Sequence, residues 1–114
     1  MKETIIYISD SEKDVYSFLE YLERKLKCNK KQCSLDRKYG ILKTENYDIV
    51  GKSVYGNRLG MGYGYCLYYC FSSNFNENKF NEIENEKLKE IIMHTRSDSK
   101  EVSELEVMYM LGLV

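Results

Sequence analysis

Apolar and polar residues alternate along the chain in a way that predicts strands at some places and helices at others. Residues 4–8 (TIIYI) are β-branched and aromatic, which predicts a first strand. A helix of about four to five turns is expected next, because apolar residues recur at helical spacing. They are Val15, Phe18, Leu19, Leu22 and Leu26. Ser9 and Glu12 have capping-box spacing and predict the start of this helix.

The middle of the chain predicts a loop and three strands. Residues 28–38 show no apolar period and are expected to form a basic loop. Residues 39–44 and 47–55 each have the alternation of a half-buried strand. Residues 63–71 are apolar on both sides, which is typical of a strand inside a sheet or at an interface.

Two more elements are expected after a polar loop. Residues 80–92 have a second helical stripe that ends near His94. Residues 102–111 suit either a helix or a strand, and we favour a helix because Asp98 and Glu101 have capping-box spacing and Gly112 suits a helix end.

The resulting order, β-α-β-β-β-α-α, predicts a single α+β domain spanning residues 1–114. We expect a mostly antiparallel sheet of about four strands with two or three helices on one face. A strand at residues 102–111 would instead give a ferredoxin-like variant of this fold.

Composition agrees with a small globular protein. The chain has 114 residues, of which 43% are hydrophobic and 31% charged, as expected for one folded domain. No apolar run is long enough to span a bilayer, and the first residues lack a signal-peptide core, so we expect a cytoplasmic protein without membrane contact. The four cysteines are then expected to be reduced or metal-bound rather than paired in disulfides.

Residues 51–71 contain five of the seven glycines and five of the eleven tyrosines. Successive glycines at 56–64 are typical of a loop whose N–H groups hold a phosphate, with Arg58 as a further donor. Their spacing matches neither the P-loop nor the dinucleotide-binding motif. The simpler alternative is a hairpin loop or bulge that lets bulky tyrosines pack.

The segment Asn57-x-x-Gly60-x-Gly62 is similar to the Q/R-x-x-G-x-G/A pyrophosphate loop of the GNAT acetyltransferases. The resemblance covers about six residues, and Asn57 stands where that family has Gln or Arg. What it implies is a nucleotide-binding or acyl-CoA-binding protein, or a transferase, that uses residues 56–64.

A basic block is the strongest charge feature. Residues 24–43 carry eight Lys or Arg against one acidic residue, although the whole chain has a net charge of −1. Such a block is either a solvated helix end or a contact with a nucleic-acid backbone. The candidate nucleic-acid contacts are Lys27, Lys30, Lys31, Arg37, Lys38 and Tyr39.

The cysteines and the acidic residues form no catalytic pattern. Cys28 and Cys33 lie in the basic block and suggest a zinc-stabilised nucleic-acid-binding protein, whereas Cys66 and Cys70 lie too far apart on a strand to share an ion. We expect neither metal nor cofactor, and we expect a protein that is not an enzyme.

Our leading hypothesis is a small binding protein that acts through a protein–protein interface. Eleven tyrosines are many for a core of this size, and tyrosine and arginine often anchor interfaces. The candidate contact residues are Tyr55, Asn57, Arg58, Gly60, Gly62, Tyr63 and Tyr65. A homodimer and an inhibitor of nucleic-acid-handling machinery, encoded by a mobile element, are further expectations.

Overall fold

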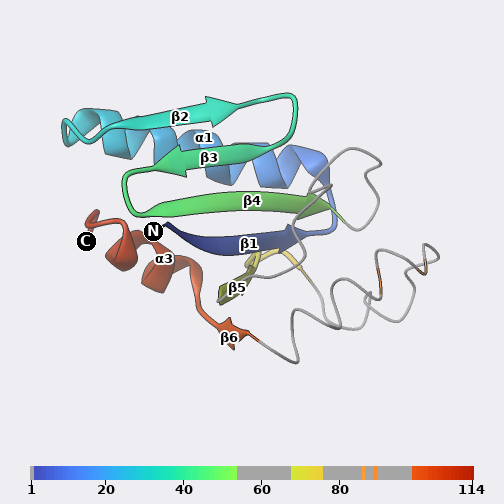
Figure 1. Cartoon of the computed structure of the whole chain (residues 1–114). Helices are drawn as coiled ribbons and strands as arrows, with labels where there is room; N and C mark the ends of the chain where they lie inside the picture. Colours follow the sequence, from blue (N-terminus) through green and yellow to red (C-terminus); the bar gives the residue numbers. More distant parts are fainter. Residues whose placement is uncertain (1, 54–67, 76–85, 87–88, 90–98) are drawn as a thin grey trace.

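The β-branched run near the N-terminus forms the central strand of a sheet, β1 (Glu3–Ser9). The structure is a computed structural model that describes residues 2–53, 68–75, 86, 89 and 99–114. Within these residues it contains six strands and two helices (Figure 1). The other elements are α1 (Glu12–Cys28), β2 (Cys33–Asp36), β3 (Ile41–Thr44), β4 (Tyr47–Ser53), β5 (Tyr68–Phe71), β6 (Lys100–Glu101) and α3 (Glu104–Met110).

The sheet is mixed, with the strand order β2-β3-β4-β1-β5-β6. β1 is parallel to both of its neighbours, β4 and β5, and β5 is parallel to β6. β2 and β3 form an antiparallel pair, and β3 is antiparallel to β4. We call the end of the sheet where β1 begins its amino end, and the end where β1 finishes its carboxyl end.

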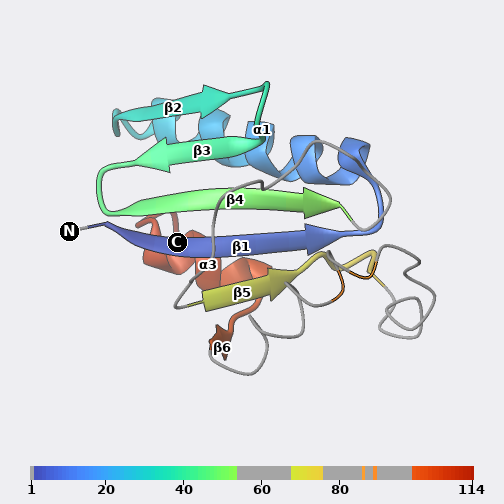
Figure 2. The ribbon, with the colours of Figure 1, turned by 45° about the vertical axis from the view of Figure 1, so that its right-hand side comes forward.

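Both helices cover the same face of the sheet, as Figure 2 shows. α1 connects the carboxyl end of β1 to the amino end of β2. Its apolar stripe is buried against the sheet, and the fully buried members are Val15, Leu19, Leu22 and Leu26. Burying each of these side chains contributes about 1.5–3 kcal/mol, so this stripe is the main support of the helix.

α1 is also stabilised at both ends. The hydroxyl of Ser11 accepts a hydrogen bond from the backbone N–H of Asp14, so Ser11 is the N-cap rather than the predicted Ser9. Acidic residues lie in the first turn and basic residues in the last, as the helix dipole favours. At the C-terminal end, Lys30 has a left-handed φ of 57°.

α3 settles the alternatives at the C-terminus in favour of a helix. Its N-cap is Ser103, which forms a complete capping box with Glu106. Gly112 has a φ of 74°, and the N–H of Leu113 donates to the carbonyl of Met108 in a Schellman motif. The cap predicted at Asp98 and Glu101 is wrong, because Glu101 belongs to β6.

α1 lies unusually close to β4 at Gly51. A β-carbon at this position would overlap Cγ1 of Val15 and would lie 3.4 Å from Cδ1 of Leu19. The N–H of Gly51 also donates to the carbonyl of Gly40, at 2.8 Å. The helix can lie this close to the strand because Gly51 has no side chain. The sequence does not reveal this packing role, because Gly51 stands next to a run of other glycines.

Several sequence predictions are wrong. The sheet is mixed rather than mostly antiparallel, because the two β1 pairs and the β5–β6 pair are parallel. It has six strands within the described residues rather than about four. The predicted basic loop at 28–38 contains β2, whose partner β3 supplies the backbone hydrogen bonds that the loop prediction ignored.

Other predictions are confirmed within the part of the chain that the structure describes. β5 lies between β1 and β6, as a strand apolar on both sides should. Tyr68 and Cys70 lie on the helix-covered face, and Tyr69 lies on the other. The predicted helix at 80–92 falls almost wholly outside the described residues, so that prediction stands as made.

We predict that Gly51→Ala lowers the free energy of unfolding by about 2–3 kcal/mol, because overpacking of a tight contact costs this much. Combining it with Val15→Ala should recover at least about 1 kcal/mol of that loss, since the smaller side chain makes room for the new methyl group. Urea denaturation of the wild type, both single variants and the double variant measures this coupling. Additive effects of the two substitutions would contradict the close approach.

Candidate functional site

The predicted protein-contact residues lie outside the described part of the chain. This holds for Tyr55, Asn57, Arg58, Gly60, Gly62, Tyr63 and Tyr65, and for Cys66 and His94. The proposed nucleotide or acyl-CoA loop at 56–64 therefore stays a prediction. The three residues just before it, Gly51, Lys52 and Ser53, are the buried end of β4.

β2 interrupts the basic block, with Lys27, Lys30 and Lys31 before the strand and Arg37, Lys38 and Tyr39 after it. A strand of this length spans about 13 Å, so the backbones of the two groups begin at opposite ends of the sheet. The side chain of Arg37 reaches back to Glu23, the same carboxylate that pairs with Lys27. The nucleic-acid contacts suggested by the sequence stay a prediction.

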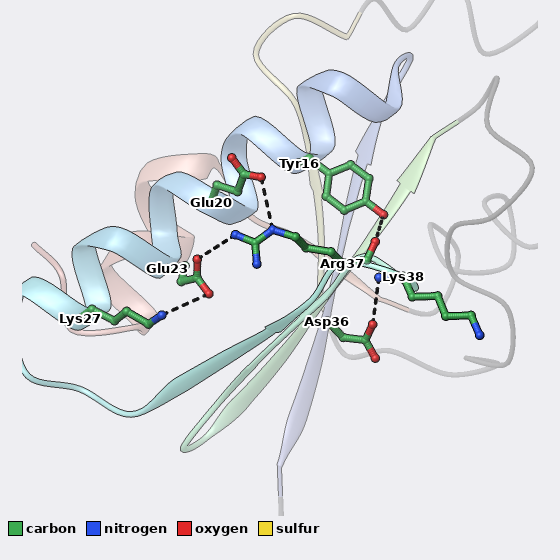
Figure 3. Close-up of polar contacts among 7 residues, drawn as sticks. All are labelled: Tyr16, Glu20, Glu23, Lys27, Asp36, Arg37 and Lys38. Carbon is green, nitrogen blue, oxygen red and sulfur yellow. Dashed lines mark hydrogen bonds and ion pairs between the residues drawn. The ribbon is translucent and has the colours of Figure 1, made fainter.

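Arg37, in the group at the carboxyl end, is held by contacts within the protein (Figure 3). Its guanidinium reaches back to α1, where it lies 3.7 Å from the carboxylate of Glu20 and 3.4 Å from that of Glu23. Its backbone carbonyl accepts a hydrogen bond from the hydroxyl of Tyr16 on α1. These contacts hold the β2–β3 turn against α1, while the ammonium of Lys38 lies 5.3 Å from the centre of the Tyr39 ring.

Lys27 and Lys31, from the group at the amino end, line an open groove of about 670 Å³, which we call the basic groove. Its lining residues are Lys2, Lys27, Lys31, Gln32, Cys33, Ser34, Lys43, Thr44 and Glu45. Sequence reasoning missed Lys2 and Lys43. Strand pairing places both lysines at the groove. Lys43 lies across from Ser34 on β2 and from Asp48 on β4, and Lys2 forms an ion pair with the same Asp48.

Lys31 has a second role at this end of the molecule. Its Nζ lies beside Gly112, where an added β-carbon would be 2.9 Å from it. α3 has no basic residue in its own last turn, and Lys31 supplies a positive charge there from the α1–β2 connection. The ammonium thus favours the docking of α3 at the amino end of the sheet.

The β5 side of the carboxyl end is acidic. An open hollow of about 450 Å³ is lined there by Phe71, Ser73, Glu101, Val102, Ser103, Glu104 and Glu106, and we call it the acidic hollow. α3 begins at this hollow, and its outer side exposes 64% of Leu105 and 73% of Tyr109. Acidic and apolar groups thus adjoin on one surface.

Glu104 is the member of the acidic hollow that also holds the fold. Its Oε2 accepts a hydrogen bond from the hydroxyl of Tyr7 at 2.9 Å, and its Oε1 accepts one from the N–H of Ser73 at 3.1 Å. Burial raises the pKa of Tyr7 far above its usual value, so its hydroxyl keeps its proton and donates. This pair attaches α3 to the centre of the sheet.

Asp14 in the first turn of α1 joins three parts of the carboxyl end. Its Oδ2 accepts hydrogen bonds from the hydroxyls of Ser9, at 2.6 Å, and Ser72, and its Oδ1 accepts one from the side-chain amide of Asn74 at 3.1 Å. Burial alone would raise the pKa of Asp14, but these three hydrogen bonds outweigh burial and lower it. The carboxylate is a structural clamp with its acceptor sites in use.

Burial keeps two of the described cysteines, Cys33 and Cys70, from being reactive nucleophiles. Cys70 is fully buried, and burial, reinforced by Glu104 and neighbouring glutamates, raises its pKa to about 12. Burial also raises the pKa of Cys33, with a contribution from Glu23. Both are therefore thiols at neutral pH. Among the described residues, no three His, Cys, Asp or Glu side chains are grouped closely enough to hold a metal ion.

No protein-family model matches the chain, and no curated protein or solved structure is significantly similar to it. No helix among the described residues is long and apolar enough to cross a membrane.

We predict that Asp14→Ala lowers the free energy of unfolding by about 2–4 kcal/mol at neutral pH, because it removes hydrogen bonds to a charged group. A lowered folded-state pKa means that this stabilisation is present above the unfolded pKa of about 3.9 and is lost as the pH falls through the folded value. The difference from wild type should therefore shrink below about pH 4. Urea denaturation across pH measures it.

The control for this experiment is Glu20→Ala, which removes an exposed carboxylate from the same helix. It should change the free energy of unfolding by no more than about 0.5 kcal/mol, as surface ion pairs usually do. A cost for Asp14→Ala that does not depend on pH would contradict the role of its charge.

A further prediction concerns the left-handed residue Lys30. Lys30→Gly should raise the free energy of unfolding by about 0.5–1 kcal/mol, because glycine adopts this conformation without a steric cost. Thermal denaturation checks it, with Lys25→Gly, inside α1, as the control that should be destabilised by a similar amount. A loss of stability in Lys30→Gly would contradict the conformation of this helix end.

Proposed function

We propose that the protein is a small binding protein, not an enzyme, and that it binds another protein through the outer side of α3 and the acidic hollow. The partner segment is one that combines basic and apolar side chains. The sequence already suggested binding through a protein–protein interface. The proposal retains that function and assigns it to a surface among the described residues.

The observation that carries the proposal is the exposure of Leu105 and Tyr109. They are one turn apart and lie on the same side of α3, and the structure leaves 64% and 73% of them exposed. The other side of the helix is apolar as well, with Val107 and Leu111 buried in the core. A helix that is apolar on both sides is typically covered on both, and a partner is the natural cover for the outer one.

Charge defines the chemistry of the partner. Residues 101–114 contain three glutamates, Glu101, Glu104 and Glu106, and neither Lys nor Arg. All three glutamates line the acidic hollow, which is wide enough to accept the end of a Lys or Arg side chain. Tyr109, one turn beyond Leu105 on α3, has the rigid, amphipathic side chain that often anchors interfaces.

This chemistry agrees with a partner from nucleic-acid-handling machinery, since such enzymes present basic surfaces to phosphates. Inhibition of such an enzyme, and a contribution from residues 54–67, stay predictions from the sequence. The acidic hollow and the exposed side of α3 support the binding of a partner protein.

The test uses a labelled amphipathic peptide of Leu and Lys as the probe and fluorescence anisotropy as the readout. The wild type should bind it, and Leu105→Ser combined with Tyr109→Ser should weaken binding at least about tenfold, because interface anchors contribute 2 kcal/mol or more. Glu101→Lys should weaken binding as well, through repulsion of the probe.

Two controls distinguish binding at this surface from non-specific binding of the peptide elsewhere on the protein. A Leu and Glu peptide of the same pattern should not bind, and Tyr39→Ser, at an exposed tyrosine on the β2–β3 turn, should leave binding unchanged. Equal binding of both peptides, or an equal effect of Tyr39→Ser, would contradict the proposal. Sedimentation of wild type and the α3 variant adds one more outcome: a dimer that only the wild type forms would identify the partner as a second copy.

A further inference from the structure

We propose that the basic groove at the amino end of the sheet binds the phosphate backbone of a nucleic acid without reading its sequence. The groove lies at the opposite end of the sheet from the acidic hollow, so this inference goes beyond the protein-binding function. Its residues overlap only in part with the nucleic-acid contacts that the sequence suggested.

Positive charge gathers in the groove from three separate parts of the chain. Lys2 precedes β1, Lys27 and Lys31 come from the end of α1 and its connection, and Lys43 lies on β3. Against these four ammonium groups, the lining contains one carboxylate, that of Glu45. A concave surface with one sign of charge attracts anions strongly.

The ion pairs within the groove are easily exchanged for pairs with a ligand. Lys2 lies 3.4 Å from Asp48 and Lys27 lies 3.5 Å from Glu23, and both lysine side chains are largely exposed. Exposed pairs of this kind contribute only about 0–1 kcal/mol. Lys31 and Lys43 form no ion pair with another described residue, so their charges are available to phosphates.

The rest of the lining favours a nucleic-acid backbone over an acidic peptide. Gln32 and Ser34 present amide and hydroxyl groups, which are common partners of phosphate oxygens, whereas the hydroxyl of Thr44 is engaged by the backbone of Tyr47. No aliphatic or aromatic side chain lines the groove, so a peptide would find no pocket for an apolar anchor. The same lack of aromatic groups leaves nothing on which a base could stack.

Lysine is suited to this kind of contact. An ammonium group on a flexible stem acts as a point charge that follows a phosphate without fixing its orientation, whereas recognition of one defined phosphate usually uses the planar fork of arginine. The groove contains lysine and no arginine. We therefore expect modest, salt-sensitive affinity that is much the same for different sequences.

The test is fluorescence anisotropy of the full chain with a labelled oligothymidylate about 20 nucleotides long, which covers more than one small binding site. Binding should weaken steeply between about 50 and 200 mM salt, with a slope of about −3 in log K against log salt if all four lysines contact phosphates. A mixed-sequence strand of the same length should bind within about threefold of it.

The matched variants separate the groove from the rest of the basic block. Lys43→Gln should weaken binding about fivefold at about 50 mM salt, and adding Lys31→Gln should make the slope less negative by about 1.4. Lys38→Gln removes an equal charge at the carboxyl end and should change nothing. Because Lys31 also contacts the end of α3, thermal denaturation must show that the double variant is still folded. If the double variant unfolds, the binding of the single variant Lys43→Gln, at an exposed position, is the test.

Several outcomes would overturn the inference. One is the absence of binding at about 50 mM salt, where non-specific nucleic-acid contacts are strongest. Another is a loss of affinity in Lys38→Gln equal to that in Lys43→Gln. A third is binding of polyglutamate as tight as that of oligothymidylate. Competition by ATP at matched phosphate concentration would show a free nucleotide as the ligand and would also overturn it. Loss of oligothymidylate binding in the Leu105→Ser, Tyr109→Ser variant would show that the two ends are not separate.

Discussion

The burial of β1 on both faces, with a parallel partner on each side, is the constraint on which the structure depends. All five residues from Ile5 to Ser9 are at most 1% exposed. A parallel neighbour can be reached only by a connection that crosses the sheet, and between β1 and β4 the chain uses α1 and the β2–β3 hairpin for this. The tight approach at Gly51 lets α1 lie close enough to cover β1 and β4 together.

Parallel strands also separate the polar groups into two sets. Connections that leave β1 and β5 meet at the carboxyl end, where Asp14 joins them and Glu104 ties α3 to Tyr7. The start of β1, the end of α1 and the end of β3 meet about 20 Å away, at the amino end. Acidic groups gather where β5 and α3 meet at the first end, and lysines gather around the start of β1 and the end of β3 at the second, so a chain with a net charge of −1 has two strongly charged surfaces.

Local patterns in the sequence predicted the local structure well. The stripe of α1, the alternation of β4, the two apolar faces of β5, and the helical C-terminus follow from apolar spacing and capping residues. The strand order does not follow from these patterns, since a strand such as β5 looks the same whether its neighbour is parallel or antiparallel. The basic groove was missed for the same reason: Lys2 and Lys43 are far from Lys31 in the sequence and meet it only through the pairing of β1, β3 and β4.

The central claim is that the two ends of the sheet are separate binding surfaces of opposite charge. The most direct test is an amide NMR spectrum of the full chain during titration with unlabelled oligothymidylate. We predict shift changes at residues 27–34 and 43–45, with residues 37–39 and 101–109 unchanged. Changes centred on residues 37–39 or 101–109, or spread evenly over the sheet, would contradict the claim.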